Sequence, residues 1–338
     1  MLALIQGNNK LSPRGGTEGT NRLVYIDIAK GIGILLVVVG HCIPDASSSS
    51  GISIPAYRWL HDVIYSFHMP LFFFLAGFMV SRKNMLDRGR HPFDLVRKRV
   101  SRLLIPYVFV GLCYAPFKLL LSKFANKPYD VSTIWQMIIG INPDGELWFL
   151  YALFVITVIA ALFSFRISVW GLAAAAFLLI WNPWEIITKY LFFFLLGIYM
   201  RRECRDFIHL LTYRDVAAVF LLFVAGNYGL LVAKQHACFL LTAISGILLT
   251  LWISWRLDQE RGMFVQYFER WGILSMDIYI LSDIIKIPFR VILWNKFHLY
   301  TVSFAICTIF SIAFSVWIST YWIRKHDVLK LLFLGIRK

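Results

Sequence analysis

The apolar stretch YIDIAKGIGILLVVVGH, residues 25–41, carries three ionisable side chains, those of Asp27, Lys30 and His41. At 100° per residue, an α-helix over this stretch places all three within one sector of about 100°. An imidazole exchanges a proton near neutral pH and suits a general base for a hydroxyl, while an ammonium group binds anions. The spacing therefore predicts a helix face that points away from lipid and holds functional groups, with His41 as the candidate base.

Asp27 and Lys30 also have a purely structural interpretation. The two residues are three positions apart, so they can neutralise each other near the inner surface of the membrane. Asp27 is a candidate for binding substrate, with this mutual ion pair as the alternative. His41 has no obvious partner on its own helix, so we favour a functional role over that of a hydrogen-bonded core histidine.

A second motif, SFHMPLFFFLAGF at residues 66–78, brings a histidine close to a proline. Pro70 removes one intrahelical hydrogen bond and is expected to kink the helix, which frees a carbonyl to meet a ligand or a polar side chain. His68 lies just before that expected break and is a candidate substrate-binding residue. The aromatic run Phe72–Phe74 is more typical of a lipid-facing or packing surface than of a binding site.

Further charged groups occur later in the chain. The segment SRKNMLDRGRHPFDLVRKRVSR, residues 81–102, is dense enough in basic residues to bind an anionic cofactor. Asp283, Lys286 and Arg290 share a helix face, where mutual pairing and a substrate role are both open. The five cysteines are scattered and contain no CxxC pair, so neither a disulfide framework nor a metal site is expected.

Composition indicates which elements position these groups. The chain has 338 residues, of which 59% are hydrophobic and 16% charged, and its mean hydropathy is +0.68. Soluble domains carry about a quarter charged residues, and about 18 apolar residues suffice to cross a hydrocarbon core of about 30 Å. The expected fold is an all-α, polytopic transmembrane helical bundle. About ten spans are predicted, at 25–43, 62–80, 103–122, 147–164, 168–181, 188–200, 215–233, 237–255, 272–294 and 300–323.

The distribution of basic residues predicts the orientation of this bundle. With the N-terminus in the cytoplasm, the inner side holds 24 of the 34 Lys and Arg, as the positive-inside rule requires. The chain is therefore expected to be N-in and C-in. Its predicted parts are a disordered cytoplasmic tail (1–22), a transmembrane domain (23–324) and a basic cytoplasmic C-terminal tail (325–338). The net charge of +15 then indicates membrane lipids as partners, and no nucleic acid.

Five motifs in order resemble the integral-membrane acyltransferase-3 family. Besides the two motifs above, they are RKRVSRLLIPY at 97–107, ELWFLYALF at 146–154 and SMDIYIL at 275–281. The Lys-Gly and Phe-His-Met-Pro forms resemble the fucose 4-O-acetylase-like branch of that family. Members O-acylate sugars of bacterial cell-surface polysaccharides, so the resemblance implies an acyltransferase of the bacterial plasma membrane.

The resemblance implies roles for single residues. Lys30 and His41 have the spacing of the basic residue and the essential histidine in the family's first span, with lysine where many members have arginine. Arg99 and Arg102 match the Arg-rich segment that opens span three, and Glu146 matches the acidic or polar residue before Trp-Phe-Leu. One position departs from the pattern: Ser282 stands where many relatives have histidine. Asp283, which follows it, is a candidate substrate-binding residue.

The resemblance also implies a donor and a route. The donor is an acyl-CoA, by family frequency acetyl-CoA, and no tightly bound cofactor is expected. Eleven residues of helix separate Lys30 from His41 by about 16 Å, comparable to the reach of a pantetheine arm. His41 is expected to deprotonate the acceptor hydroxyl or to carry the acyl group transiently, and Glu146 to orient the imidazole or bind the acceptor. The residues expected to bind the donor phosphates are Arg97, Arg99, Arg102 and Lys30.

The acceptor implied by the resemblance is a sugar of an exopolysaccharide, an O-antigen or a lipid-linked glycan precursor. An exporter of saccharides or lipid-linked oligosaccharides is the alternative function, since broken spans and buried charges also suit a transporter. The sequence shows no inverted repeat, which favours the enzyme. A purely structural membrane subunit is disfavoured because each idle ionisable residue at mid-bilayer costs about 2.5 kcal/mol or more. Nothing in the sequence defines an oligomeric state.

Overall fold

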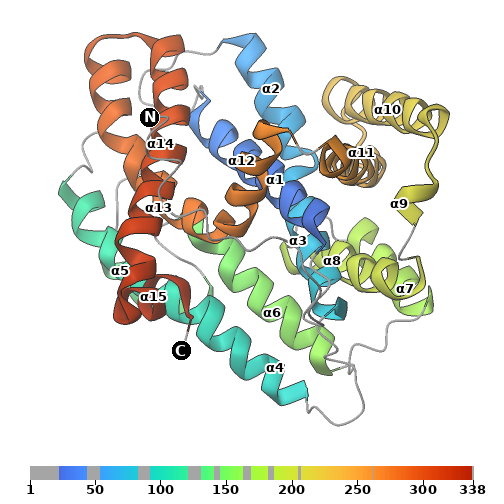
Figure 1. The fold of residues 1–338 in the computed structure, drawn as a ribbon, viewed down its shortest axis with the longest axis horizontal. Helices are drawn as coiled ribbons and strands as arrows, with labels where there is room; N and C mark the ends of the chain where they lie inside the picture. Colours follow the sequence, from blue (N-terminus) through green and yellow to red (C-terminus); the bar gives the residue numbers. More distant parts are fainter. Residues whose placement is uncertain are drawn as a thin grey trace.

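The structure is a computed structural model, and it describes residues 23–43, 54–82, 92–120, 131–140, 145–162, 169–181, 186–204, 207–260 and 262–336. Within these ranges the chain forms helices and no strand, which confirms the all-α prediction (Figure 1). The α-helices are α1 (Val24–Cys42), α2 (Pro55–Tyr65), α3 (His68–Arg82), α4 (Pro92–Arg99), α5 (Ile105–Leu120), α6 (Trp148–Leu162), α7 (Val169–Trp181), α8 (Ile186–Glu203), α9 (Phe207–Leu210), α10 (Tyr213–Asn227), α11 (Cys238–Glu260), α12 (Met263–Ile273), α13 (Ser275–Phe289), α14 (Tyr300–Tyr321) and α15 (Asp327–Leu334). Short π-helical or 3₁₀ stretches are η2 (Val100–Leu104), η4 (Val131–Ile139), η5 (Gly145–Leu147), η6 (Tyr228–Val232), η7 (Arg290–Lys296) and η8 (Ile323–Lys325).

Six helical segments of the described chain are long and apolar enough to cross a membrane. Two shorter apolar helices, Trp148–Leu162 and Trp170–Leu179, correspond to two more of the expected spans. The membrane-protein prediction is confirmed at this level, whereas the count of ten spans and the N-in, C-in orientation remain predictions. The six segments are Val24–Cys42, Pro55–Val80, Val96–Phe117, Tyr213–Val232, Cys238–Glu260 and Tyr300–Lys325.

Helix α1 occupies the centre of the molecule. It packs against α2, α3, α11, α12, α13 and α14, and most of its residues are buried (Figure 1). In a membrane, a helix with ionisable side chains on one face needs protein partners along that face, and α1 has helices around it. The polar face that carries Asp27, Lys30 and His41 is therefore directed at protein rather than at lipid.

Two helix crossings depend on glycines that face each other's backbone. A Cβ on Gly31 of α1 would lie 2.0 Å from the carbonyl oxygen of Phe268 in α12, and a Cβ on Gly272 would lie 1.7 Å from that of Asp27. Gly77 of α3 and Gly197 of α8 form a second reciprocal pair. Small residues allow this closeness between helices in a membrane, where packing drives association.

The second predicted span is broken one turn earlier than expected. Helix α2 ends at Tyr65, Ser66 and Phe67 form a turn, and α3 begins at His68. Pro70 thus lies in the first turn of α3, where its missing N–H costs little, and the break comes before His68 instead of after it. This turn sets the directions of the side chains that precede and follow it, including Tyr65 and His68.

The aromatic run of α3 is part of the core. Phe73 and Phe74 are fully buried, and the Phe73 ring stacks on Tyr190 of α8 at 4.5 Å between centroids. Trp148, at the start of α6, contacts the rings of both Phe73 and Tyr190. The packing interpretation of Phe72–Phe74 is therefore confirmed, and this aromatic cluster joins α3, α6 and α8.

The C-terminal segment includes helix α15, which packs on α5. Phe333 contacts Phe109 edge to face, Ser101 donates to the carbonyl of Gly335 at 3.1 Å, and Arg102 Nη1 donates to the carbonyl of Leu334 at 2.9 Å. Orphan carbonyls at the end of α15 are thereby satisfied. The segment 325–338, expected as a basic tail, thus contains a docked helix between Asp327 and Leu334.

Candidate functional site

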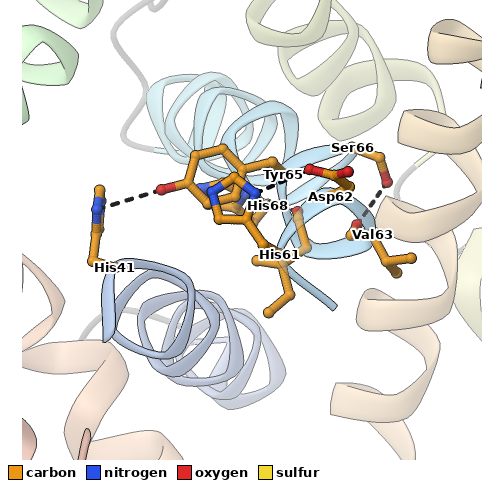
Figure 2. A network of polar contacts seen from close by, with 8 residues as sticks. His41, His61, Asp62, Val63, Tyr65, Ser66 and His68 are labelled. Carbon is orange, nitrogen blue, oxygen red and sulfur yellow. Dashed lines mark hydrogen bonds and ion pairs between the residues drawn. The ribbon is translucent and has the colours of Figure 1, made fainter. Parts of the chain in front are cut away.

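His41 lies in the last turn of α1 and meets Tyr65, the last residue of α2. The Tyr65 hydroxyl oxygen is 3.4 Å from His41 Nδ1, and the two rings are arranged edge to face (Figure 2). The imidazole has a partner after all, but on the neighbouring helix. Which of the two groups donates depends on the tautomer of His41.

Two further histidines surround the Tyr65 ring. His61, one turn earlier on α2, stacks on it with centroids 3.9 Å apart, and the ring of His68 of α3 lies at a steep angle to it with centroids 4.7 Å apart. His61 Nδ1 in turn lies 3.1 Å from the carboxylate of Asp62. Figure 2 shows these side chains gathered between α1 and the α2–α3 turn. We call His41, His61, Tyr65 and His68 the imidazole–tyrosine cluster.

The tautomer of neutral His68 follows from its partner. His68 Nδ1 is 2.8 Å from the carbonyl oxygen of Ile64, and a carbonyl accepts but never donates. Nδ1 therefore carries the proton and Nε2 keeps its lone pair. The side chain is buried, with 1% exposed, and His41, His61 and Lys189 of α8 lie close enough to interact with it electrostatically.

Asp27 and Lys30 form the ion pair that the sequence allowed. Lys30 Nζ lies 3.3 Å from Asp27 Oδ1, and the lysine side chain is 22% exposed. Asp27 is buried where α12 crosses α1 at Gly272. The structural interpretation of Asp27 is thus realised, and the partial exposure of Lys30 still leaves its ammonium group within reach of a ligand.

Asp283 is paired on its own helix, and the pair lies beside the end of α1. Its Oδ1 is 2.6 Å from Lys286 Nζ, and each side chain is about 10% exposed. Both groups are close enough to Cys42, the residue after His41, to interact electrostatically with its thiol. The mutual pairing proposed from the sequence therefore occurs near the level of His41. Ser282, at the position that departs from the family pattern, is buried.

The arginines predicted to bind the donor differ in their surroundings. Arg97 is exposed at the end of α4, and Arg99 is partly exposed. Arg102 donates to the Leu334 carbonyl and lies within electrostatic range of Asp277 and Arg324. Glu146 lies in η5, directly before α6, and its side chain is outside the described part of the structure.

Four residues that the structure brings into polar clusters were not candidates from the sequence: His61, Tyr65, Asp277 and Arg324. His61, Tyr65 and His68 are spaced by four and three residues, a helical repeat that would have placed them on one face. Asp277 lies inside a quoted motif, yet its partner Arg324, at 2.6 Å, is 47 residues away. The spacing was readable from sequence, whereas the Asp277–Arg324 pair was not.

No metal centre can be assigned among the described residues. No group of three or more His, Cys, Asp or Glu side chains there is arranged to hold a metal ion. The imidazole–tyrosine cluster offers instead proton acceptors, a hydroxyl and aromatic surfaces. Such a set is suited to proton transfer and to binding a polar substrate.

An all-helical chain with several helices of membrane-spanning length and a histidine site at the end of its central helix is an integral membrane protein of the helical class. Residues 23–320 match the family model described as an acyltransferase domain, and that match covers most of the chain. The protein therefore belongs to this acyltransferase family, as the five motifs indicated. The five motifs and the candidate residues within them all lie inside the matched region.

Two named relatives are similar over part of the chain. The nodulation protein NolL of Mesorhizobium japonicum is 28% identical over 171 residues, and NolL of Sinorhizobium fredii is 30% identical over 177 residues. Each alignment covers 48% of this chain, and 42% or 43% of the relative. The matched region thus spans less than half the length of these curated relatives. No solved structure matches the chain.

Proposed function

We propose that this protein is a membrane O-acyltransferase that moves an acyl group from a cytoplasmic acyl-CoA to a hydroxyl of a sugar. The single observation that carries the proposal is His41, held at the end of the central helix with its Nδ1 3.4 Å from the Tyr65 hydroxyl, within a matched acyltransferase domain. Acetyl is the acyl group proposed, and the bacterial plasma membrane is the proposed location. The acceptor is a sugar of an exopolysaccharide, an O-antigen or a lipid-linked glycan precursor, in keeping with the fucose 4-O-acetylase-like motifs.

His41 acts as the general base in the direct route. Its Nε2 takes the proton from the sugar hydroxyl, the oxygen attacks the thioester carbonyl, and the carbon–sulfur bond breaks. The leaving thiolate then takes the proton from the imidazolium, so that a sugar ester and CoA thiol result. In the second route Nε2 attacks the thioester first, and the carbon–sulfur bond breaks to release the CoA thiolate. The sugar hydroxyl then attacks the acyl-imidazole, its proton goes to the thiolate, and the neutral imidazole is restored. Both routes need a lone pair on Nε2.

The donor is proposed to bind with its phosphates at Arg97, Arg99 and Lys30, all of which have some exposure. Arg102 contributes charge to this region while it anchors α15. Lys30 lies about 16 Å along α1 from His41. With the phosphates near Lys30, the pantetheine arm is long enough to bring the thioester to the imidazole. Guanidinium groups are well suited to phosphate oxygens because they donate two hydrogen bonds in a fixed plane.

The acceptor is proposed to bind on the far side of His41 from the donor phosphates. Asp283, near Cys42, and His68, in the imidazole–tyrosine cluster, are the groups close to this end of α1. Carboxylates and imidazoles accept hydrogen bonds from sugar hydroxyls. Glu146 is proposed to orient the imidazole or to bind the acceptor, and Asp27 acts mainly through its ion pair with Lys30.

The proposal is tested by replacing His41. Purified protein in detergent is incubated with radiolabelled acetyl-CoA and a panel of lipid-linked oligosaccharides. We expect label in the saccharide for the wild type and a loss of about 100-fold or more for His41→Ala, since general acid–base catalysis contributes about 10²–10⁴-fold. His326→Ala, an exposed histidine before α15, is the matched control and is expected to keep full activity.

Three outcomes separate the possibilities. Label in the saccharide that depends on His41 supports the enzyme with His41 at its centre. Equal labelling by the wild type and a folded His41→Ala variant would contradict the role of His41. If the wild type neither binds nor turns over acetyl-CoA, the proposed donor is contradicted and saccharide export is favoured.

A further inference from the structure

The ring of Tyr65 lies against the backbone of α1 at Gly40. A Cβ placed on Gly40 would lie 2.9 Å from Tyr65 Cε2, so the ring occupies the space that any larger residue would need. Gly40 immediately precedes His41 in sequence. The glycine therefore allows Tyr65 to approach α1 one residue away from the candidate base.

The ring is also held by its two histidine neighbours. His61 stacks on it at 3.9 Å with 22° between the planes, and His68 meets it at 4.7 Å with 64° between the planes. His68 is itself fixed, because its Nδ1–H donates to Ile64 at 2.8 Å. With contacts on Gly40, His61 and His68, the ring presents its hydroxyl to His41 Nδ1 in a defined direction (Figure 2).

The hydrogen bond at Nδ1 decides what Nε2 can do. A neutral imidazole has one protonated nitrogen and one with a lone pair, and the partner of one nitrogen selects the state of the other. A tyrosine hydroxyl accepts as well as donates. If Nδ1–H donates to Tyr65, then Nε2 keeps the lone pair that both catalytic routes require. The opposite assignment would protonate Nε2 and leave no base at that atom.

We propose that Tyr65 is the positioning residue of His41: its hydroxyl accepts a hydrogen bond from Nδ1–H and keeps Nε2 unprotonated for the reaction. This inference rests on the proposed function of His41. Tyr65 does not react in this scheme. It selects the tautomer and fixes the imidazole plane, while Gly40, His61 and His68 hold its ring.

The direct test is Tyr65→Phe, which keeps the ring and removes only the hydroxyl. We expect kcat to fall about tenfold, the effect of losing one hydrogen bond, with KM for acetyl-CoA unchanged. Protein labelled with ¹⁵N-histidine gives the second readout. The His41 signals, assigned by their loss in His41→Ala, should report protonated Nδ1 in the wild type and a mixture of tautomers in Tyr65→Phe. Tyr57→Phe is the matched control, because Tyr57 lies on the same helix and packs on Phe304.

A second variant tests the contact between Gly40 and the Tyr65 ring without changing Tyr65 itself. Gly40→Ala places a methyl group against Tyr65 Cε2 and should displace the hydroxyl from Nδ1, lowering kcat by a similar factor. Combined with Tyr65→Phe, it should add little, since both changes remove the same interaction. Gly262→Ala is the control, because a Cβ at that position meets no atom within 4 Å.

The outcomes distinguish this inference from the proposed function. If Tyr65→Phe keeps the wild-type kcat and the wild-type tautomer while His41→Ala is inactive, Tyr65 has no positioning role and the proposed function stands. If His41→Ala is fully active, the proposed function fails first. A tautomer with protonated Nε2 in the wild type would overturn the positioning role whatever the rates are.

Discussion

The side chain of Asp277 is fully buried, and its carboxylate accepts a hydrogen bond from Arg324 Nη2 at 2.6 Å. Arg102 lies within electrostatic range of the same group. Asp277 thus links three segments that the positive-inside rule assigns to the cytoplasmic side: the start of span three, the start of α13 and the end of α14. A charge buried with its partner stabilises a structure mainly because removing either group leaves the other uncompensated.

Replacement of Asp277 therefore tests this link. Asp277→Asn keeps the shape and removes the charge, and we expect it to destabilise the protein by about 1.5–3 kcal/mol, the range for hydrogen bonds to charged groups. The measurement is the midpoint of thermal unfolding in detergent. Asp327→Asn is the matched control, because Asp327 is 47% exposed in its pair with Lys330 and such surface pairs contribute about 0–1 kcal/mol. Equal shifts in the two variants would contradict the expected role.

The histidines show how the same residue type acquires different roles from its partners. His68 is buried and has its tautomer set by a carbonyl, whereas His41 meets a hydroxyl that can donate or accept. His61 stacks on Tyr65 and lies beside Asp62. Of the three, His41 is the one whose Nδ1 meets a tyrosine hydroxyl, which is why Tyr65 is the residue to change.

Among the elements, the crossing of α1 and α12 positions the polar face of α1. Gly31 and Gly272 bring the two backbones together, and the carbonyl of Asp27 lies directly against Gly272. Backbone atoms cannot move aside as a side chain can. The crossing therefore holds Asp27 and Lys30 in place, while the α2–α3 turn brings Tyr65 to His41 at the other end of α1.

A methyl group at this crossing should separate the two helices. Gly272→Ala places a Cβ 1.7 Å from the Asp27 oxygen, and we expect overpacking to destabilise the protein by about 1–3 kcal/mol. The unfolding midpoint should fall and KM for acetyl-CoA should rise, because Lys30 lies one turn from Asp27. Gly262→Ala, at the start of the same helix and in open space, should change neither. An unchanged midpoint for Gly272→Ala would show that the crossing tolerates a larger residue.

At the scale of the whole molecule, the arrangement follows the needs of a chain in lipid. Backbone groups are satisfied within helices, and the ionisable residues of α1 and α13 face other helices. The Asp277–Arg324 ion pair and the hydrogen bond from Arg102 to the end of α15 join segments that are all predicted to lie on the cytoplasmic side. The donor phosphates and the reacting imidazole are then expected at opposite ends of one central helix.

Topology is the prediction that belongs to this scale. In a variant whose five native cysteines are replaced, a cysteine at Gln235 should react with a membrane-impermeant maleimide in intact spheroplasts, because the segment after span seven is predicted to be outside. A cysteine at Lys98 should react only after lysis. Both positions are exposed in the structure. Labelling of Lys98→Cys in intact spheroplasts would refute the N-in orientation.

Much of the fold was predictable because its signals are local. The length of apolar runs indicates helices, and α1, α6, α8 and α14 begin and end within a few residues of the expected spans. The α2–α3 break was foreseen from Pro70 but placed on the wrong side of His68, since a proline belongs in the first turn of the helix that follows the break. Helix identity could thus be predicted, but the turn geometry could not be read to the residue.

The sequence by itself determined that α1 is a helix with Asp27, Lys30 and His41 on one face, because a helical repeat relates residues only three or four positions apart. It also determined the family through motifs that lie within single spans. Only the tertiary structure decided that Tyr65 reaches His41, that Arg324 meets Asp277 and that Gly272 lies against Asp27. These contacts join residues 24 or more positions apart, and they depend on how helices cross, which local periodicity does not specify.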